Sequence, residues 1–313
     1  MNAFKKFNLI NLSYTLLVIG WGAFVRASGS GAGCGAHWPL CNGEVLPATE
    51  QLKTLIEFMH RTSSGMSLML VVFGYLWSRK LSPKGSWIRT SAFYSVIAIF
   101  MEAILGAGLV LLKLVEFDQS ISRAFAISLH LVNTLFLVSA LSTLTWYSFH
   151  PDAGMKKMKA WFPRDRFFRV CTGVFLLLGI TGAITALGDT LFPATSHANG
   201  MRQDMASGAH FLLKLRVLHP IIAVTWIMLV FVWSSRFERV ETTKIRTMLI
   251  LGITTQFLLG FMNWMLMAPT GMQIVHLLVA DGVFIAFWIS GHINESLEQL
   301  PQRTAANTVP EIT

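Results

Sequence analysis

Long apolar segments separated by short polar stretches dominate the pattern of this chain. Eight of these segments are long enough to cross the hydrocarbon core of a bilayer, which takes about 20 apolar residues in a helix. They lack the alternation of barrel strands, so helices are the predicted spanning form. The predicted spans are Phe7–Val25, Leu55–Trp77, Ile88–Leu111, Ala124–Tyr147, Phe167–Leu187, Phe211–Trp233, Ile245–Met267 and Met272–His292.

The amino-acid composition agrees with this pattern. The chain has 313 residues, of which 53% are hydrophobic and 13% are charged, whereas soluble domains average about 25% charged residues. The mean hydropathy is +0.56. We therefore expect an all-α integral membrane protein with eight transmembrane helices.

The net charge of +9 does not indicate a nucleic-acid-binding protein, because the basic residues follow the predicted topology. Most of them lie in loops and segment ends on the side of the N-terminus. By the positive-inside rule this side is cytoplasmic, so both termini are predicted inside, and membrane lipid is the expected partner of the basic side chains. The first segment has no small-residue cleavage site, and no Arg- and Ser-rich transit peptide precedes it. These features favour a retained helix in a bacterial plasma membrane.

The second half of the chain repeats the first. Each copy holds four predicted helices, an even number, so the copies should have parallel topology. We expect two pseudo-symmetric four-helix bundles, at 1–149 and 170–295, with a basic linker at 150–169 and a polar tail at 296–313. The matched residues recur at offsets that shrink from 160 to 146 positions: Gly22 with Gly182, His60 with His219, Gly106 with Gly260, and His130 with His276.

Four histidines carry the most specific chemical signal. His60, His130, His219 and His276 each lie near the same, outer end of an apolar segment, two in each half. An imidazole in hydrocarbon is costly unless it is ligated or paired. Two histidines that face each other at one depth are suited to be axial ligands of a haem iron. Hydrogen bonding between helices is the alternative for a single histidine, and zinc is disfavoured because no Cys or carboxylate cluster completes a tetrahedral set.

A carboxylate distinguishes the two halves. Glu57 precedes His60 by one helical turn on the same face. There it fits proton transfer or stabilisation of a cationic intermediate, with an ion pair to Arg61 or Arg26 as the alternative. The second half has Arg216 near the corresponding place. The first bundle is therefore predicted to be reactive and the second to hold a cofactor.

For other polar residues of the outer side, the sequence allows two alternative roles. Glu102, whose partner in the repeat is Gln256, is either a second acid or a polar bond between helices. Four arginines either pair with haem propionates or extend to lipid headgroups, and we assign Arg61 and Arg216 to cofactor binding. Cys34 and Cys41 lie in a loop on the oxidising side, which favours a disulfide over a metal site. The four arginines are Arg26, Arg61, Arg123 and Arg216.

In its motifs the chain resembles the haem A synthase family. The resemblance continues to the segment of His276 and so covers nearly the whole membrane part. It is carried by Gly22-Ala-Phe-Val-Arg-Ala-Ser-Gly-Ser-Gly-Ala-Gly-Cys34, His37-Trp-Pro-Leu-Cys41, Glu57-Phe-Met-His60-Arg61, His130-Leu-Val-Asn and Leu215-Arg-Val-Leu-His219-Pro220.

The resemblance implies an oxidoreductase acting on a CH group. Its reaction would convert the C8 methyl of haem O into the formyl of haem A, through a gem-diol that loses water, for cytochrome oxidase assembly. The substrate haem would be held by His60 and His130, with Glu57 beside the methyl group. A haem O synthase is the partner implied as the source of substrate, and a homo-oligomer is compatible with the resemblance.

The resemblance also implies a cofactor and a disulfide bond. A resident haem b would be ligated by His219 and His276, and Cys34 and Cys41 would form the outer disulfide of the family. Some members carry a second cysteine pair in the corresponding loop of the second half, but residues 188–209 contain no cysteine here. This departure puts in doubt any thiol relay that needs both loops.

Two other classes of protein remain as alternatives. A di-haem b-type electron-transfer cytochrome would use the same four histidines, but it needs no acid such as Glu57 beside one of them. A transporter built on parallel repeats would need helix breaks near the midplane, whereas the prolines here lie mostly in loops or near segment ends.

Overall fold

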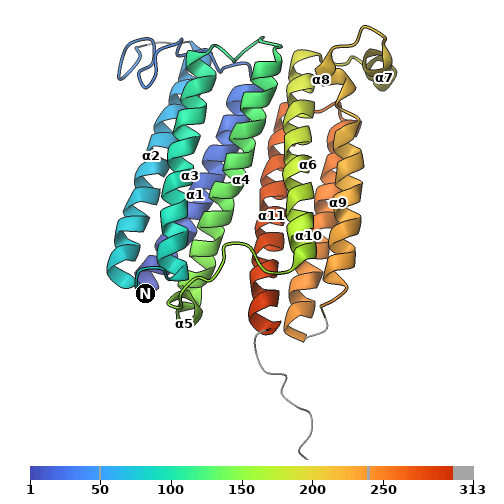
Figure 1. Cartoon of the computed structure of the whole chain (residues 1–313). Coiled ribbons are helices and arrows are strands. Elements are labelled where there is room, and N and C mark those ends of the chain that lie inside the picture. Colours follow the sequence, from blue (N-terminus) through green and yellow to red (C-terminus); the bar gives the residue numbers. More distant parts are fainter. Residues whose placement is uncertain (49–50, 238–239, 299–313) are drawn as a thin grey trace, which may run out of the picture.

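A computed structural model describes residues 1–48, 51–237 and 240–298, and all its regular elements there are helices (Figure 1). The predicted tail at 296–313 lies outside the described residues from position 299 onward. The first part of the chain forms α1 (Asn2–Ala27), α2 (Leu52–Leu81), α3 (Trp87–Leu111), α4 (Ile121–Phe149) and the short α5 (Pro151–Gly154). The second part forms α6 (Arg166–Leu191), α7 (His197–Met205), α8 (Phe211–Lys214), α9 (Leu218–Ser234), α10 (Val240–Met265) and α11 (Thr270–Glu298).

Within the described residues, seven helical segments are long and apolar enough to cross a membrane. They are α1, α3, α4, α6, α8 together with α9, α10, and α11. The remaining predicted span, Leu55–Trp77, corresponds to α2, which has 30 residues but is not among the seven. Its polar run His60-Arg-Thr-Ser-Ser lowers its hydropathy. The chain is therefore a multi-pass membrane protein with seven candidate spans.

The long helices form two groups that lie side by side (Figure 1). In the first group α1 contacts α2 and α4, and α3 contacts α2 and α4; in the second, α9 contacts α6 and α10, and α10 contacts α11. The groups meet where α4 contacts α6 and α11 and where α1 contacts α11. Leu135 and Val138 of α4 are buried there with Phe168, Trp226 and Phe287. In lipid, such a junction is stabilised mainly by van der Waals packing.

The sixth predicted span is interrupted, which the apolar pattern did not predict. A turn at residues 215–217 separates α8 from α9. Pro220 explains the interruption, because proline has no N–H and its ring clashes with the carbonyl four residues earlier, so it is tolerated only in the first turn of a helix. As a result His219 lies in the first turn of α9.

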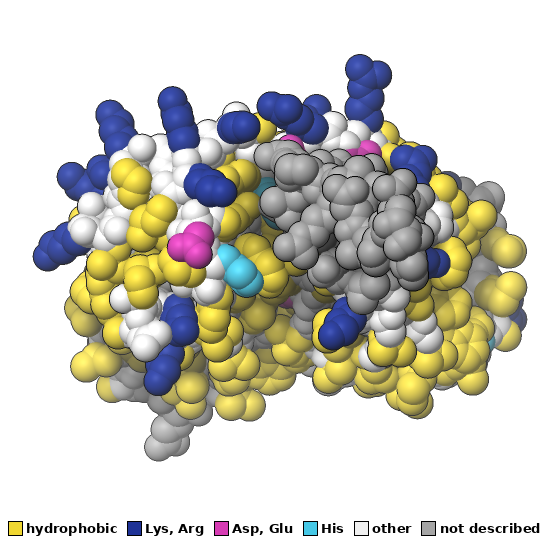
Figure 2. Space-filling model, turned by 90° about the horizontal axis from the view of Figure 1, so that it is seen from below, with side chains coloured by type: hydrophobic (Ala, Val, Ile, Leu, Met, Phe, Trp, Pro, Cys, Tyr) yellow, Lys and Arg dark blue, Asp and Glu magenta, His cyan; other side chains and the backbone are white. Residues whose placement is uncertain are grey.

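Basic side chains gather on the face that carries the N-terminus and α5 (Figure 2). This face holds the ends of α2 and α6, with Arg79 and Lys80 in the last turn of α2 and Arg166 at the start of α6. The four histidines of the sequence analysis lie toward the opposite ends of their helices. The structure therefore separates the basic face from the candidate site.

Candidate functional site

The four histidines line one cavity of about 1580 Å³. His60 comes from α2 and His130 from α4, whereas His219 comes from α9 and His276 from α11. Glu57, Arg61, Glu102, Arg216 and Gln256 line the same cavity. Residues far apart in the sequence are thus brought to one site, which extends from the first helix group into the second.

Each histidine packs against a glycine of a neighbouring helix. A Cβ atom added at three of these glycines would lie 3.0 Å from Cε1 of the facing imidazole, and one added at Gly106 would lie 3.6 Å from Nε2 of its histidine. At those three glycines a larger residue would therefore force the imidazole to shift, whereas a Cβ at Gly106 would make an ordinary van der Waals contact. The pairs are Gly22 with His60, Gly106 with His130, Gly182 with His219, and Gly260 with His276.

One ring nitrogen in each of three of these histidines lacks a hydrogen-bond partner. Nδ1 of His60, of His219 and of His276 is buried without a hydrogen bond. Buried polar atoms are nearly always paired, so an unpaired one calls for an explanation such as a ligand. The rings of His219 and His276 are 6.4 Å apart between centroids and nearly perpendicular, at 84°. This spacing leaves room for one metal atom between them, since metal–imidazole bonds are about 2 Å long.

His130 differs from the other three because its ring is held by a carboxyl group. Its Nδ1 pairs with Oε2 of Glu102. Asn133 donates from Nδ2 to Oε1 of the same carboxyl at 2.8 Å. In the second half the amide of Gln256 lies 3.3 Å from Nε2 of His276. Of the two roles left open for Glu102, the structure favours a polar bond between helices, made directly to a cavity histidine.

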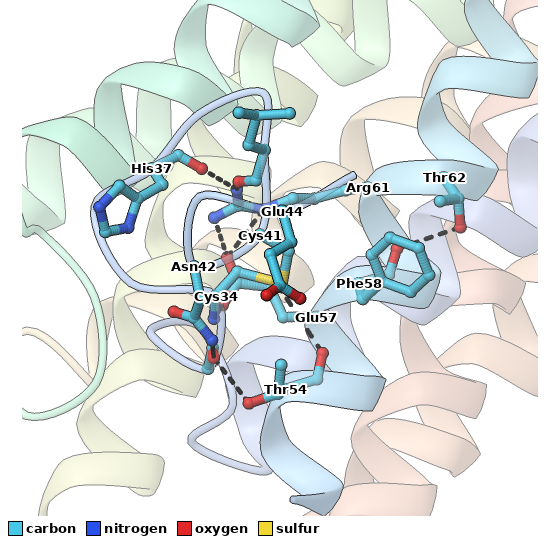
Figure 3. The surroundings of a disulfide bond; sticks show 12 residues. Cys34, His37, Cys41, Asn42, Glu44, Thr54, Glu57, Phe58, Arg61 and Thr62 are labelled. Carbon is cyan, nitrogen blue, oxygen red and sulfur yellow. Dashed lines mark hydrogen bonds and ion pairs between the residues drawn. A yellow bond between two sulfur atoms is a disulfide. The ribbon is translucent and has the colours of Figure 1, made fainter. Parts of the chain in front are cut away.

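Glu57 lies against a disulfide-closed loop (Figure 3). Cys34 and Cys41 form the disulfide, as predicted, and the backbone N–H of Cys34 donates to Oε2 of Glu57 at 2.8 Å. Arg61 donates from Nε to Oε1 of Glu57 at 3.1 Å and from Nη1 to the carbonyl of Leu40 at 2.6 Å. Glu57 is only 3% exposed. The loop and Arg61 together hold the carboxyl at the cavity wall.

In the second half Arg216 takes the place of the acid, and its partners are carboxylates from other elements. Asp189 of α6 lies 3.1 Å from Nε of Arg216, and Asp204 of α7 lies 3.5 Å from Nη1. Burial raises the pKa of the Asp204 carboxyl above its usual value, and the Arg216 guanidinium opposes this rise. The ion pairs of Arg216 with Asp189 and Asp204 therefore hold the outer loop of the second half in place, which in the first half is done by the disulfide.

The remaining two outer arginines are also held by the protein. Arg26 of α1 donates from Nη1 to Oγ1 of Thr190 at 2.8 Å and from Nη2 to Oε1 of Gln273 at 2.9 Å. Arg26 thereby joins α1 to α6 and α11. Arg123 donates to backbone carbonyls of the preceding loop, including that of Asp118 at 2.7 Å. Contact with lipid headgroups therefore does not account for these two side chains.

Three polar residues of the helix interior were not identified from the sequence: Asp281 and His292, which are buried, and Asn133, which is half-buried. Asp281 of α11 is 2% exposed, and its Oδ2 has no hydrogen-bond partner; an acid inside an apolar segment was the available signal. Asn133 was passed over because its partner lies on another helix. His292 is also 2% exposed, because α11 places it among the rings of Trp87 and Trp288.

The chain is similar to curated proteins of two different names. Two proteins of Thermus thermophilus strains named protoheme IX farnesyltransferase are 39% and 38% identical over 280 residues. The match takes in 88% of this chain but 46% of each relative, so the chain spans about half the length of these relatives. Heme A synthase of Bacillus licheniformis is 32% identical over 63% of this chain and 65% of that protein. Heme A synthase of Staphylococcus haemolyticus is 27% identical over 83% and 82%, respectively.

The family match covers almost the whole described membrane part. It extends over residues 5–288, so it includes the disulfide loop, Glu57 and all four cavity histidines. The chain belongs to the COX15-CtaA family, described as cytochrome oxidase assembly proteins.

Proposed function

We propose that this protein is a haem A synthase, which oxidises the C8 methyl of haem O to a formyl group. The observation that carries the proposal is one cavity in which two histidine pairs meet, with the buried carboxyl of Glu57 at its wall one helical turn from His60 of the first pair. The family and the relatives named heme A synthase support it. A di-haem electron-transfer cytochrome is the second candidate, since it would use the same histidines.

The residues of the cavity fit haem on three counts. Three buried Nδ1 atoms lack partners, and four glycines give the imidazoles their space. A volume of about 1580 Å³ also exceeds the roughly 300–1,000 Å³ of a pocket for one small ligand.

The two halves would then differ in what they bind. His60 and His130 hold the substrate haem O, and His219 and His276 hold a resident haem b, whose iron supplies one-electron redox chemistry. Arg61 and Arg216 line the cavity beside these pairs. Their guanidinium groups would pair with the propionates of the bound haems. Oxidising a methyl group releases protons, and Glu57 is the buried group placed to accept them.

The proposed architecture follows the same division. Residues 1–149 form a substrate bundle and 170–295 a haem b bundle, with α2 as the eighth span and 150–169 as the linker. The repeated glycine–histidine pairs support pseudo-symmetry between them. The basic face supports a plasma-membrane topology with both termini in the cytoplasm, which places the disulfide loop on the outer side.

A haem O synthase is the proposed source of substrate. The longer Thermus relatives are named for transfer of a farnesyl group to protoheme, and haem O is farnesylated protohaem. This chain itself is not proposed to transfer the farnesyl group. The match takes in 46% of each of those relatives, so the activity in their names is not carried over to this chain.

Production of the chain together with a haem O synthase, in cells that make no haem A, tests the function. Haem A is expected in the extracted haem, because haem O then meets a complete oxidation site. Cells that produce the synthase alone are the control and should hold haem O only. If the haem O remains unchanged and the purified chain holds protohaem, the result would favour the di-haem electron-transfer cytochrome.

Gly182→Val is expected to displace His219 and remove haem from the second half. A Cβ at this position would already lie 3.0 Å from the imidazole, whereas Gly173 on the same helix has open space around it. Gly173→Val is therefore the matched control and should keep its haem. The measurement is haem bound per purified chain, and equal haem contents of the two variants would contradict the glycine–histidine packing as a determinant of the site.

A further inference from the structure

A chain of hydrogen bonds ends on His130 in the first half of the cavity. Both oxygens of the Glu102 carboxyl are engaged, one by Nδ1 of His130 and the other by Nδ2 of Asn133 at 2.8 Å. Asn133 also donates to the carbonyl of Ala98, one helical turn before Glu102, at 2.9 Å. The amide thus orients the carboxyl, and the carboxyl orients the imidazole.

The second half lacks both partners. By the offsets of the repeat, Gln256 stands where Glu102 stands and Val279 where Asn133 stands. Val279 packs against the apolar core. The Gln256 amide nitrogen lies 3.3 Å from Nε2 of His276 and can only donate to it. Among the four cavity histidines, all of them described, His130 is the one with a carboxyl partner on its ring nitrogen.

A carboxyl acceptor on the far nitrogen of an imidazole affects the metal that the near nitrogen binds. It fixes the tautomer and the ring orientation, and it makes the ligating nitrogen a stronger electron donor. A stronger donor stabilises the oxidised iron and so lowers the reduction potential of a haem. An amide that donates to the ring nitrogen, as Gln256 does, gives no such effect.

We propose that Glu102, oriented by Asn133, is a positioning residue that fixes His130 and lowers the reduction potential of the haem bound in the first half relative to the second. The proposal rests on the proposed function in that His130 must ligate a haem. It assigns different electronic properties to two sites that the repeat makes alike in their histidines. Electrons shared between the two haems would then reside mainly in the second half.

Redox titration of the full chain, purified with protohaem in both sites, tests this inference through absorption spectra. The wild type is expected to show two potentials. Glu102→Gln should raise the lower one, because it replaces the carboxyl by the amide found in the other half. Gln256→Glu, the reciprocal change, should lower the higher one.

Two further variants separate electronic tuning from folding. Glu102→Asp keeps a carboxyl group and should lie closer to the wild type than Glu102→Gln does. Asn133→Val copies the second half and should shift the lower potential in the same direction as Glu102→Gln. These variants and Gln256→Glu decide the matter if Glu102→Gln fails to fold.

The outcomes separate this inference from the proposed function. If Glu102→Gln binds haem with unchanged potentials, the inference is overturned and the proposed function stands. If Glu102→Gln cannot be obtained, unchanged potentials in Asn133→Val and Gln256→Glu have the same meaning. A wild-type chain that binds no haem overturns both.

Discussion

Replacing Glu57 with glutamine is expected to lower the rate of haem A formation by about 10²- to 10⁴-fold, the usual contribution of a positioned general acid or base. Glutamine is nearly the same size and keeps one acceptor oxygen for the N–H of Cys34, which lies 2.8 Å from the carboxyl. It cannot accept a proton as the carboxylate does. The bound haem is expected to stay in place, because the hydrogen bonds of Glu57 run to Cys34 and Arg61 and not to the histidines proposed to ligate the iron.

The control for Glu57→Gln is a carboxylate of the disulfide loop that Glu57 contacts. Glu44 is exposed and lies beside the disulfide partner Cys41 (Figure 3), so Glu44→Gln tests the loss of a charge near the loop without touching the cavity. Haem A formation, haem content and disulfide content are measured on both variants. A normal rate in Glu57→Gln, or a decrease fully explained by lost haem, would remove Glu57 from the chemistry.

Much of the fold could be predicted because it depends on local properties of the chain. Segment length and hydropathy are summed over neighbouring residues, so most spans were placed within a few residues of the observed helices. The interruption before His219 was missed because the apolar run continues through it, although Pro220 was a visible sign. For α2 the same residues that make the site, from His60 onward, weaken the signal of the span.

The site was predictable in its residue types more than in its contacts. Histidines at matching positions of a repeat can be recognised in the sequence as candidate ligands. Two cysteines in one small loop allow few pairings. Which residue binds the Glu102 carboxyl was not predictable, because His130 and Asn133 lie on a different helix. The partners of Arg26 are more than 150 positions away in the sequence, and only the packing of the two helix groups brings them together.

Removal of one histidine from each half is expected to remove a different haem. His219→Ala takes a ligand from the proposed haem b pair, and His60→Ala takes one from the proposed substrate pair. Loss of a metal ligand should cost more than the roughly 10- to 100-fold in affinity that loss of an outer-shell partner costs. Because the two pairs belong to different helix groups, each variant should leave the other site folded.

Mass analysis of the haems extracted from these two variants, purified after production with a haem O synthase, tests the central claim most directly. His219→Ala is predicted to lose protohaem and to retain the farnesylated haem, and His60→Ala is predicted to do the reverse and to form no haem A. Loss of the same haem from both variants, or haem A formation that survives in His60→Ala, would contradict the division of the cavity into a substrate half and a cofactor half.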